Sequence, residues 1–150
     1  MSSFSKDPTP RTPFRNNEYL RSTKDVKTNS HTFAKGAIPT ITVDGDVQKV
    51  LQPGTVLAKI TSGPDTGKVG VYQPTTPTDG RQTAANIVGV VDTFLPWQLL
   101  ERDVEVAVVY EATVVQAWCI EYNAAGALIA LTNTTRDAIL ALPGLALLFQ

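Results

Sequence analysis

From Ala37 onward, short runs of β-branched and other apolar residues are separated by turns rich in glycine and proline, and this pattern constrains the fold most. Asp44-Gly45 lies between two such runs and predicts a two-residue hairpin turn, because glycine accepts the positive φ that this turn requires. The run from Val104 to Tyr110 alternates most regularly between apolar and other positions. Many short strands joined by tight turns indicate a mostly β fold, a small barrel or a sandwich.

Further strands are predicted at 55–60, 69–72, 84–91 and 113–122 from their apolar, β-branched composition. In the first of them, Val56, Ala58 and Ile60 fall on one face. Gly89 interrupts the third and predicts a bulge or a close backbone contact, because a glycine leaves no side chain to pack.

One short helix is predicted near the C-terminus. Thr134 precedes Asp137 by three residues, which is a capping-box pattern. Pro143 and Gly144 end the helix, because proline cannot continue it and glycine accepts the left-handed exit. The apolar tail at 145–150 predicts a last strand within the sheet or against a neighbouring subunit.

The N-terminal part of the chain differs from the rest in charge. Residues 1–35 carry seven Lys or Arg and three acidic residues, whereas the whole chain has a net charge of -1. Their few apolar residues follow no period, so the segment cannot bury enough surface to offset its ordering entropy. We expect residues 1–36 to form an arm that is mobile in the free protein, and residues 37–150 to form the folded domain. A tail without a role is the alternative, which Phe14 and Tyr19 disfavour because a solvating tail has no use for aromatic side chains.

Composition argues against several classes of function. The slightly negative net charge gives no positive field to hold nucleic acid, and no apolar stretch reaches the roughly 18–20 residues of a membrane span. One cysteine and one histidine provide neither an internal disulfide nor a zinc-type site. His31 lies in the polar arm without a tuning pocket, and Cys119 fits the strand pattern as a small buried apolar residue. We therefore expect no enzyme, no metal and no cofactor.

Two sequence stretches resemble the lambda-type bacteriophage head (capsid) decoration proteins. The segment 51–61, with Pro53-Gly54-Thr55-Val56-Leu57 at its start, is similar to their opening turn and strand. Tyr72 and Pro74, followed by Asp-Gly-x-Gln-x-Ala-x-x-Ile at 79–87, match the next stretch of that family. The resemblance covers about residues 37–150; the longer arm, the apparent insertion at 94–103 and the shorter helix depart from it.

The resemblance implies a small β-barrel or β-tulip-like domain that forms homotrimers on the outer surface of an expanded icosahedral capsid. Such a protein is made in the host cytoplasm, becomes part of the virion and stabilises the head against packaged DNA. Its implied partners are the major capsid protein and further copies of itself. The arm is expected to become ordered on the capsid by adding a strand to an exposed edge, and its 35 residues reach at most about 115 Å.

The residues expected to bind the capsid are Phe14, Arg15, Tyr19, Arg21 and Phe33. Those expected at the trimer interface are Phe94, Leu95, Trp97, Leu148 and Phe149. The two apolar segments that carry them, 94–97 and 145–149, would equally suit the core of a single subunit.

A small β-barrel ligand-binding or carrier module is the alternative function, with Lys68 as the attachment residue that a carrier would need. An enzyme is the weakest interpretation, because no nucleophile has a suitable base. Deletion of residues 2–35 is expected to leave the trimer intact and to abolish capsid binding.

Overall fold

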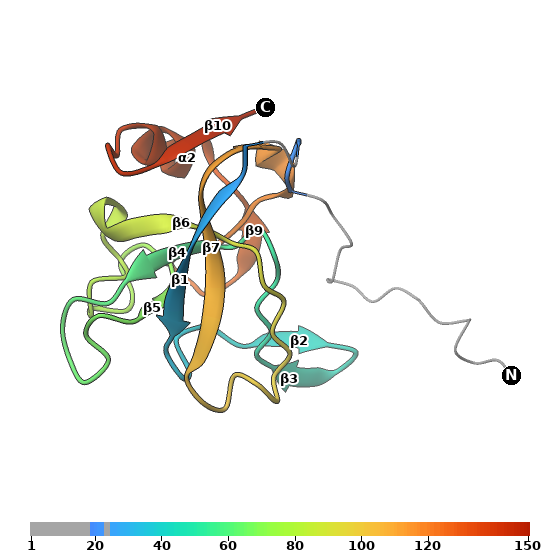
Figure 1. The fold of residues 1–150 in the computed structure, drawn as a ribbon. Helices are drawn as coiled ribbons and strands as arrows, with labels where there is room; N and C mark the ends of the chain where they lie inside the picture. The colour runs from blue at the N-terminus through green and yellow to red at the C-terminus, as the bar shows by residue number, and fades with distance from the viewer. Residues whose placement is uncertain (1–18, 23–24) are drawn as a thin grey trace, which may run out of the picture.

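The computed structural model describes residues 19–22 and 25–150, and shows a closed β-barrel with a short helix near the C-terminus (Figure 1). The expectation of a mostly β fold built on a small barrel is confirmed. The barrel strands are β1 (Lys27–Phe33), β4 (Val56–Lys59), β5 (Val69–Val71), β6 (Ile87–Val91) and β7 (Val104–Val114). They follow one another in the order β1-β5-β4-β6-β7, and β7 pairs with β1 to close the ring.

Strand β7 is the longest and connects the barrel to the C-terminal part of the chain. It pairs antiparallel with β1 from Val104 to Glu111, and antiparallel with β6 near Val108 and Val109. Beyond that point, β10 (Ala146–Phe149) pairs with it in parallel. Glu111 is in register with residues of both β1 and β10, so these two strands lie on opposite edges of β7. The predicted last strand is therefore part of the sheet.

The apolar side chains form two cores, one on each side of the barrel wall. The first fills the interior and receives at least one residue from each barrel strand, among them Phe33 of β1 and Val108 of β7. The second lies outside the wall, where Ile139 and Leu147 of the C-terminal part pack against Val109. A chain of this size thus buries apolar residues on both faces of the same strands, which a simple alternating pattern does not predict.

A bulge explains how β7 supplies both cores. The register with β1 shifts after Lys27, so that Tyr110 is the additional residue on β7. A bulge of this kind reverses which face the following side chains occupy. Val106 and Val108 point into the barrel, whereas Ala112 and Val114 join the second core. The predicted alternation from Val104 to Tyr110 is thus right up to the bulge.

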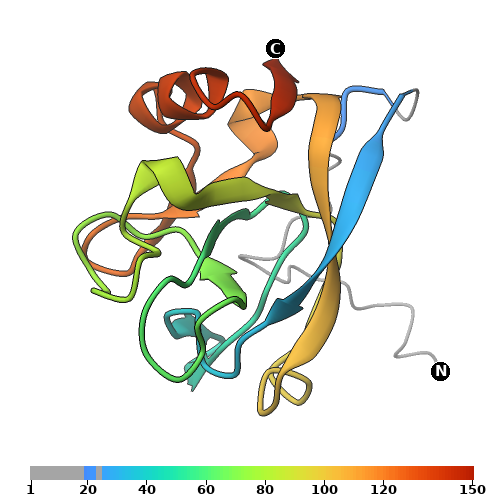
Figure 2. The ribbon, with the colours of Figure 1, turned by 60° about the vertical axis from the view of Figure 1, so that its left-hand side comes forward.

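The predicted hairpin is confirmed. Strands β2 (Ile41–Val43) and β3 (Asp46–Gln48) pair antiparallel, and Asp44 and Gly45 between them have φ values of 53° and 88°. Positive φ at both central residues is the requirement of a type I′ turn. The hairpin lies at the opposite end of the barrel from β10 (Figures 1 and 2).

The segment after β7 differs from the prediction of one strand over 113–122. The chain leaves β7 at Val114, forms a 3-10 turn at Gln116–Trp118, and begins the short strand β8 (Ile120–Tyr122), which pairs with β9 (Leu128–Ala130). Helix α2 (Asn133–Leu140) follows and begins one residue before the predicted cap. Thr132, and not Thr134, is the N-cap, because its side chain accepts a hydrogen bond from the backbone N–H of Thr135.

The predicted domain boundary at residue 36 is wrong. Residues 27–33 form β1, which closes the barrel through its pairing with β7. The sequence of β1 is polar and only Phe33 is fully buried, so its ladder of backbone hydrogen bonds to β7 holds it in place. Deletion of residues 2–35 would remove a barrel strand and cannot serve as a test of the arm.

Candidate interaction surfaces

Two residues predicted to bind the capsid lie in the cores of their own barrel. Phe33 is fully buried in the interior, and Tyr19 is 3% exposed in the second core. Their predicted role as anchors in a partner is therefore wrong. Arg21 is exposed and donates a hydrogen bond from Nε to Oε1 of Gln150 at 3.0 Å. Phe14 and Arg15 lie outside the described residues.

Tyr19 fixes the point from which the preceding residues leave the barrel. Its hydroxyl donates a hydrogen bond to Oδ1 of Asp92 at 2.5 Å, and its carbonyl accepts one from the N–H of Val115 at 2.7 Å. The ring packs so closely on Gly54 that a Cβ there would lie 3.0 Å from Cβ of Tyr19. Burial and the neighbouring Asp92 raise the pKa of the Tyr19 phenol well above its ordinary value. The leader, defined here as residues 1–18, thus starts from a fixed place on the barrel.

This place is adjacent to the C-terminus. The N–H of Arg21 donates to the carbonyl of Thr113 at 2.8 Å on one edge of β7. The N–H of Gln116 donates to the carbonyl of Gln150 at 2.9 Å. Tyr19 to Arg21 and the C-terminus therefore lie close together at the end of β7 (Figure 1).

The residues predicted for the trimer interface fall into two separate regions. Phe94 and Trp97, 49% and 47% exposed, belong to the β6–β7 connection, whereas Leu148, 62% exposed, lies on β10. Leu95 is 3% exposed and pairs through its backbone with Leu51, so its expected place at an interface is wrong. Phe149 is half-buried and packs against the second core.

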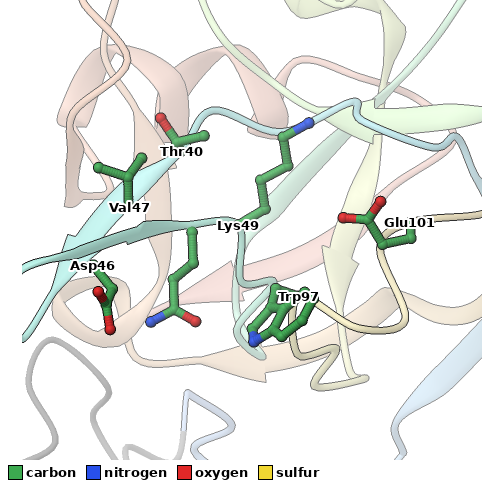
Figure 3. Close-up of a pocket in the computed structure, with 7 residues that line it drawn as sticks. Thr40, Asp46, Val47, Lys49, Trp97 and Glu101 are labelled. Atoms are coloured by element: carbon green, nitrogen blue, oxygen red, sulfur yellow. The ribbon is translucent and has the colours of Figure 1, made fainter.

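Trp97 lines an open groove at the hairpin end of the barrel, which is called the Trp97 groove below (Figure 3). Its volume is about 570 Å³. Asp46 and Glu101 lie on either side of the indole, and Lys49 lies above it (Figure 3). The remaining lining residues are Thr40, Val47 and Gln48.

Sequence reasoning missed three further exposed apolar side chains. Val47 is 68% exposed, Leu140 is 53% exposed and Trp118 is 43% exposed. Val47 directly follows the Asp44–Asp46 turn, and this position close to a hairpin tip is the signal that would have identified it. The sequence gives no such signal for Leu140 and Trp118, because each lies between one buried apolar residue and one exposed alanine.

Two polar clusters connect distant segments. Nζ of Lys68 forms ion pairs with Asp65 at 2.8 Å and with Asp103 at 2.7 Å, and these hydrogen bonds raise the pKa of the lysine. Glu121 is 2% exposed and accepts hydrogen bonds from Thr132 and Thr135 at the start of α2. The first cluster holds the candidate carrier lysine to two carboxylates. The second fixes the start of α2 on β8.

The candidate catalytic residues are separated from one another. His31 lies on β1, and burial followed by the nearby Lys59 lowers the pKa of its imidazole. Cys119 is buried in the second core, and burial raises the pKa of its thiol to about 12. Among the described residues, no three His, Cys, Asp or Glu side chains are grouped to hold a metal ion. Within this part of the chain no helix is both long and apolar enough to cross a membrane.

No protein-family model matches this sequence, and a search of curated proteins gives no match either.

Proposed function

We propose that this chain is a structural, non-enzymatic capsid decoration protein of a lambda-type bacteriophage. It binds as a homotrimer to the outside of the expanded icosahedral shell, where its partners are the major capsid protein and its own copies. The leader makes the contact with capsid subunits, so that the protein belongs to the outer surface of the virion. The alternative of a carrier module is disfavoured because Lys68, its candidate attachment residue, is held in two ion pairs.

The anchoring of Tyr19 is the observation that best supports this function. A tyrosine that contributes its ring to the core and its hydroxyl to Asp92 gives the leader a fixed origin on a closed barrel. Such an origin allows the leader to transmit load from a partner to the barrel, as a head-stabilising protein requires. The sequence resemblance over residues 37–150 supports the same function independently of this contact.

Exposed apolar side chains support self-association. Leu148 is 62% exposed on β10 and Trp97 is 47% exposed beside the hairpin. Large apolar side chains that lie at the surface of a single copy mark contact sites when they gather in a patch. A trimer with three-fold symmetry needs two different patches on each copy, because its contacts are heterologous. The two regions, at opposite ends of the barrel, are the candidates for these patches (Figure 1).

Co-sedimentation with phage heads tests the proposal. The full chain, a variant without residues 2–18, and a variant with residues 2–18 in scrambled order are each mixed with expanded and unexpanded heads of the phage that encodes the protein. We expect the full chain to bind expanded heads, and both variants to remain trimeric but to lose binding. The scrambled leader keeps the charge and composition, so it separates a specific contact from electrostatic attraction.

Two results would refute the proposal. One is a monomer at all concentrations in sedimentation velocity. The other is equal head binding by the full chain and by the variant without residues 2–18.

A further inference from the structure

The side chain of Arg81 is held against the barrel by its stem and by one of its three nitrogen atoms. It is only 11% exposed, and the stem crosses strand β5 at Gly70, where a Cβ would lie 2.6 Å from Cδ of Arg81. A glycine inside a strand often allows such a close approach. Nε of Arg81 donates hydrogen bonds to the two carboxylate oxygens of Asp79 at 3.1 and 3.2 Å. The guanidinium group is therefore fixed in place.

The loop that carries Arg81 is fixed as well. The backbone N–H of Arg81 donates to Oδ1 of Asp79 at 3.1 Å, and the N–H of Gly80 donates to Oε1 of Gln82 at 2.8 Å. Nδ2 of Asn86 donates to the carbonyl of Gly80 at 2.8 Å. A loop held by its own side chains loses little further entropy when a ligand binds to it.

The terminal nitrogens of Arg81, Nη1 and Nη2, have no hydrogen-bond or ion-pair partner among the described residues. Every bond of the guanidinium group to this part of the chain is made by Nε. The terminal nitrogens carry the other N–H donors of the group. Charged donors that are mostly withdrawn from water are costly to leave unpaired, and a carboxylate can accept from both nitrogens in one plane. These two atoms are therefore available to an acidic ligand.

Arg81 lines an open pocket of about 370 Å³, which is called the Arg81 pocket below. Ile38, Pro39 and Pro77 give it apolar walls, and no acidic side chain lines it within the described part of the chain. Its edge carries a second basic group, because Nζ of Lys49 lies 3.4 Å from the position of a Cβ on Gly36, which also lines the pocket. The ligand suited to this pocket has a carboxylate on a short apolar stem.

We propose that the Arg81 pocket binds an acidic side chain of a protein partner. The carboxylate pairs with Nη1 and Nη2 of Arg81, and the methylene stem packs against Pro39 and Pro77. Ligand pockets for small molecules cover most of the surface of their ligand, which an open pocket of this size does not do. A side chain of a protein brings the contacts of the surrounding surface with it. This site goes beyond the proposed function, since it involves neither the leader nor the exposed apolar side chains.

A peptide titration tests the proposal on the full ¹⁵N-labelled chain without any capsid, so its result is independent of the proposed function. The probe is acetyl-Gly-Glu-Gly-amide, and acetyl-Gly-Gln-Gly-amide is its uncharged match. Nuclear magnetic resonance follows the side-chain Nε–H of Arg81 and the backbone amides of Gly36 and Gly126, which line the pocket. We expect saturable shifts of these signals with the glutamate peptide and none with the glutamine peptide.

Three variants assign the binding to Arg81, with Gly36 and Gly126 as the signals that all of them keep. Arg81→Gln is expected to bind the glutamate peptide about tenfold more weakly or not at all, because it loses charged hydrogen bonds. Arg81→Lys keeps the charge but loses the planar pair of donors, and is expected to bind more weakly than the parent. Arg102→Gln is the control, since it removes a charge at an exposed position outside the pocket. Unshifted amide signals elsewhere show that each variant keeps its fold.

Four results would overturn the proposal. The first is the absence of shifts at Gly36 and Gly126 with the glutamate peptide, and the second is equal binding of the two peptides. The third is binding by Arg81→Gln or Arg81→Lys that is as tight as that of Arg102→Gln. The fourth is tighter binding of acetate or inorganic phosphate than of the glutamate peptide, because the pocket would then be a site for a free small anion.

Discussion

The hydroxyl of Tyr19 donates a hydrogen bond to the carboxylate of Asp92, which lies 73 positions later in the chain. Asp92 directly follows β6, and the carbonyl of Tyr19 also pairs with Val115 beyond the end of β7. One residue thus connects the described N-terminal segment to two barrel strands. The functional boundary between leader and barrel lies at this residue, and not at residue 36.

Tyr19→Ala is expected to destabilise the protein by about 3–5 kcal/mol, because it removes a buried aromatic ring. Tyr19→Phe keeps the ring and loses only the hydrogen bond to Asp92, at a cost of about 1 kcal/mol. Urea unfolding measures both changes. Tyr110→Phe is the control, since no hydrogen bond is found for its hydroxyl among the described residues, and it is expected to change stability by less than Tyr19→Phe. A smaller loss for Tyr19→Ala than for Tyr19→Phe would contradict the anchoring role.

Alkaline pH is expected to weaken the fold. Burial raises the pKa of the phenols of Tyr19, Tyr72 and Tyr122, and raises that of the Cys119 thiol to about 12. In the unfolded chain these groups ionise near their ordinary values, about 8.5 for the thiol and about 10 for a phenol. The unfolded state therefore releases protons first, and stability decreases as the pH rises above about 9.

Urea titrations between pH 7 and pH 11 measure this decrease. Cys119→Ala removes one of the four groups and is expected to make the slope shallower by up to about 1.4 kcal/mol per pH unit. A stability that is constant to pH 11 would show that these side chains are not buried in solution.

Local chemistry explains which parts of the fold were predictable. The β2–β3 turn follows from the local pair Asp44-Gly45, and Gly45 has the positive φ that the sequence predicted. Strand β1 was missed because its polar side chains carry no apolar period; its position depends on pairing with β7, which is distant in sequence. Val56, Ala58 and Ile60 were predicted to share one face of a strand. Val56 and Ala58 do share a face and lie in the second core, whereas Ile60 packs in the first core because it follows the end of β4 at Lys59.

The exposed side chains of the candidate surfaces were hard to predict for the same reason, because their burial depends on contacts between residues that are distant in sequence. The sequence around an isolated aromatic residue such as Tyr19 does not show whether its side chain packs in the core of its own chain or against a partner. Leu95 and Trp97 belong to one apolar segment, and only the backbone pairing of Leu95 with Leu51 decides which of them is buried. Sequence therefore identified the segments that carry exposed apolar side chains, but not which side chains those are.

Gly89→Ala is expected to disrupt the barrel. Gly89 has a φ of 140°, and a Cβ there would lie 2.2 Å from the carbonyl oxygen of Val109, which belongs to the neighbouring strand. Backbone cannot move aside without loss of the β6–β7 pairing, so we expect a cost of about 3 kcal/mol or more. Gly63→Ala is the matched control, because its φ is also positive, at 88°, but nothing lies within 4 Å of the added Cβ.

Thermal unfolding measures the two glycine variants. The control is expected to lose about 1–2 kcal/mol from backbone strain alone. Similar losses at both positions would mean that the close approach of β6 and β7 at Gly89 does not exist in solution.

Leu148→Ser is expected to weaken self-association without loss of folding. Leu148 is 62% exposed on β10, so the substitution removes apolar surface that the single copy does not use. Sedimentation velocity over a range of concentrations is expected to show a higher dissociation constant for the trimer. Val47→Ser removes an equally exposed apolar residue that lines the Trp97 groove, in the other candidate region, and is expected to weaken the trimer as well. A trimer that neither substitution weakens would exclude both regions from the contact.

Glu121→Ala is expected to detach the start of α2. The carboxylate accepts hydrogen bonds from the N–H of Thr132 at 2.7 Å and from the hydroxyl of Thr135 at 2.9 Å. Removal leaves buried donors without partners, so we expect a loss of about 3 kcal/mol in urea unfolding. Thr135→Val removes one donor of the same cluster at similar volume and is expected to cost about half as much, because the other hydrogen bonds remain.

Since α2 packs against β10 and carries Ile139 of the second core, amide exchange at β10 is expected to accelerate in Glu121→Ala. Unchanged exchange at β10 would show that the cluster fixes only the helix start and not the C-terminal strand.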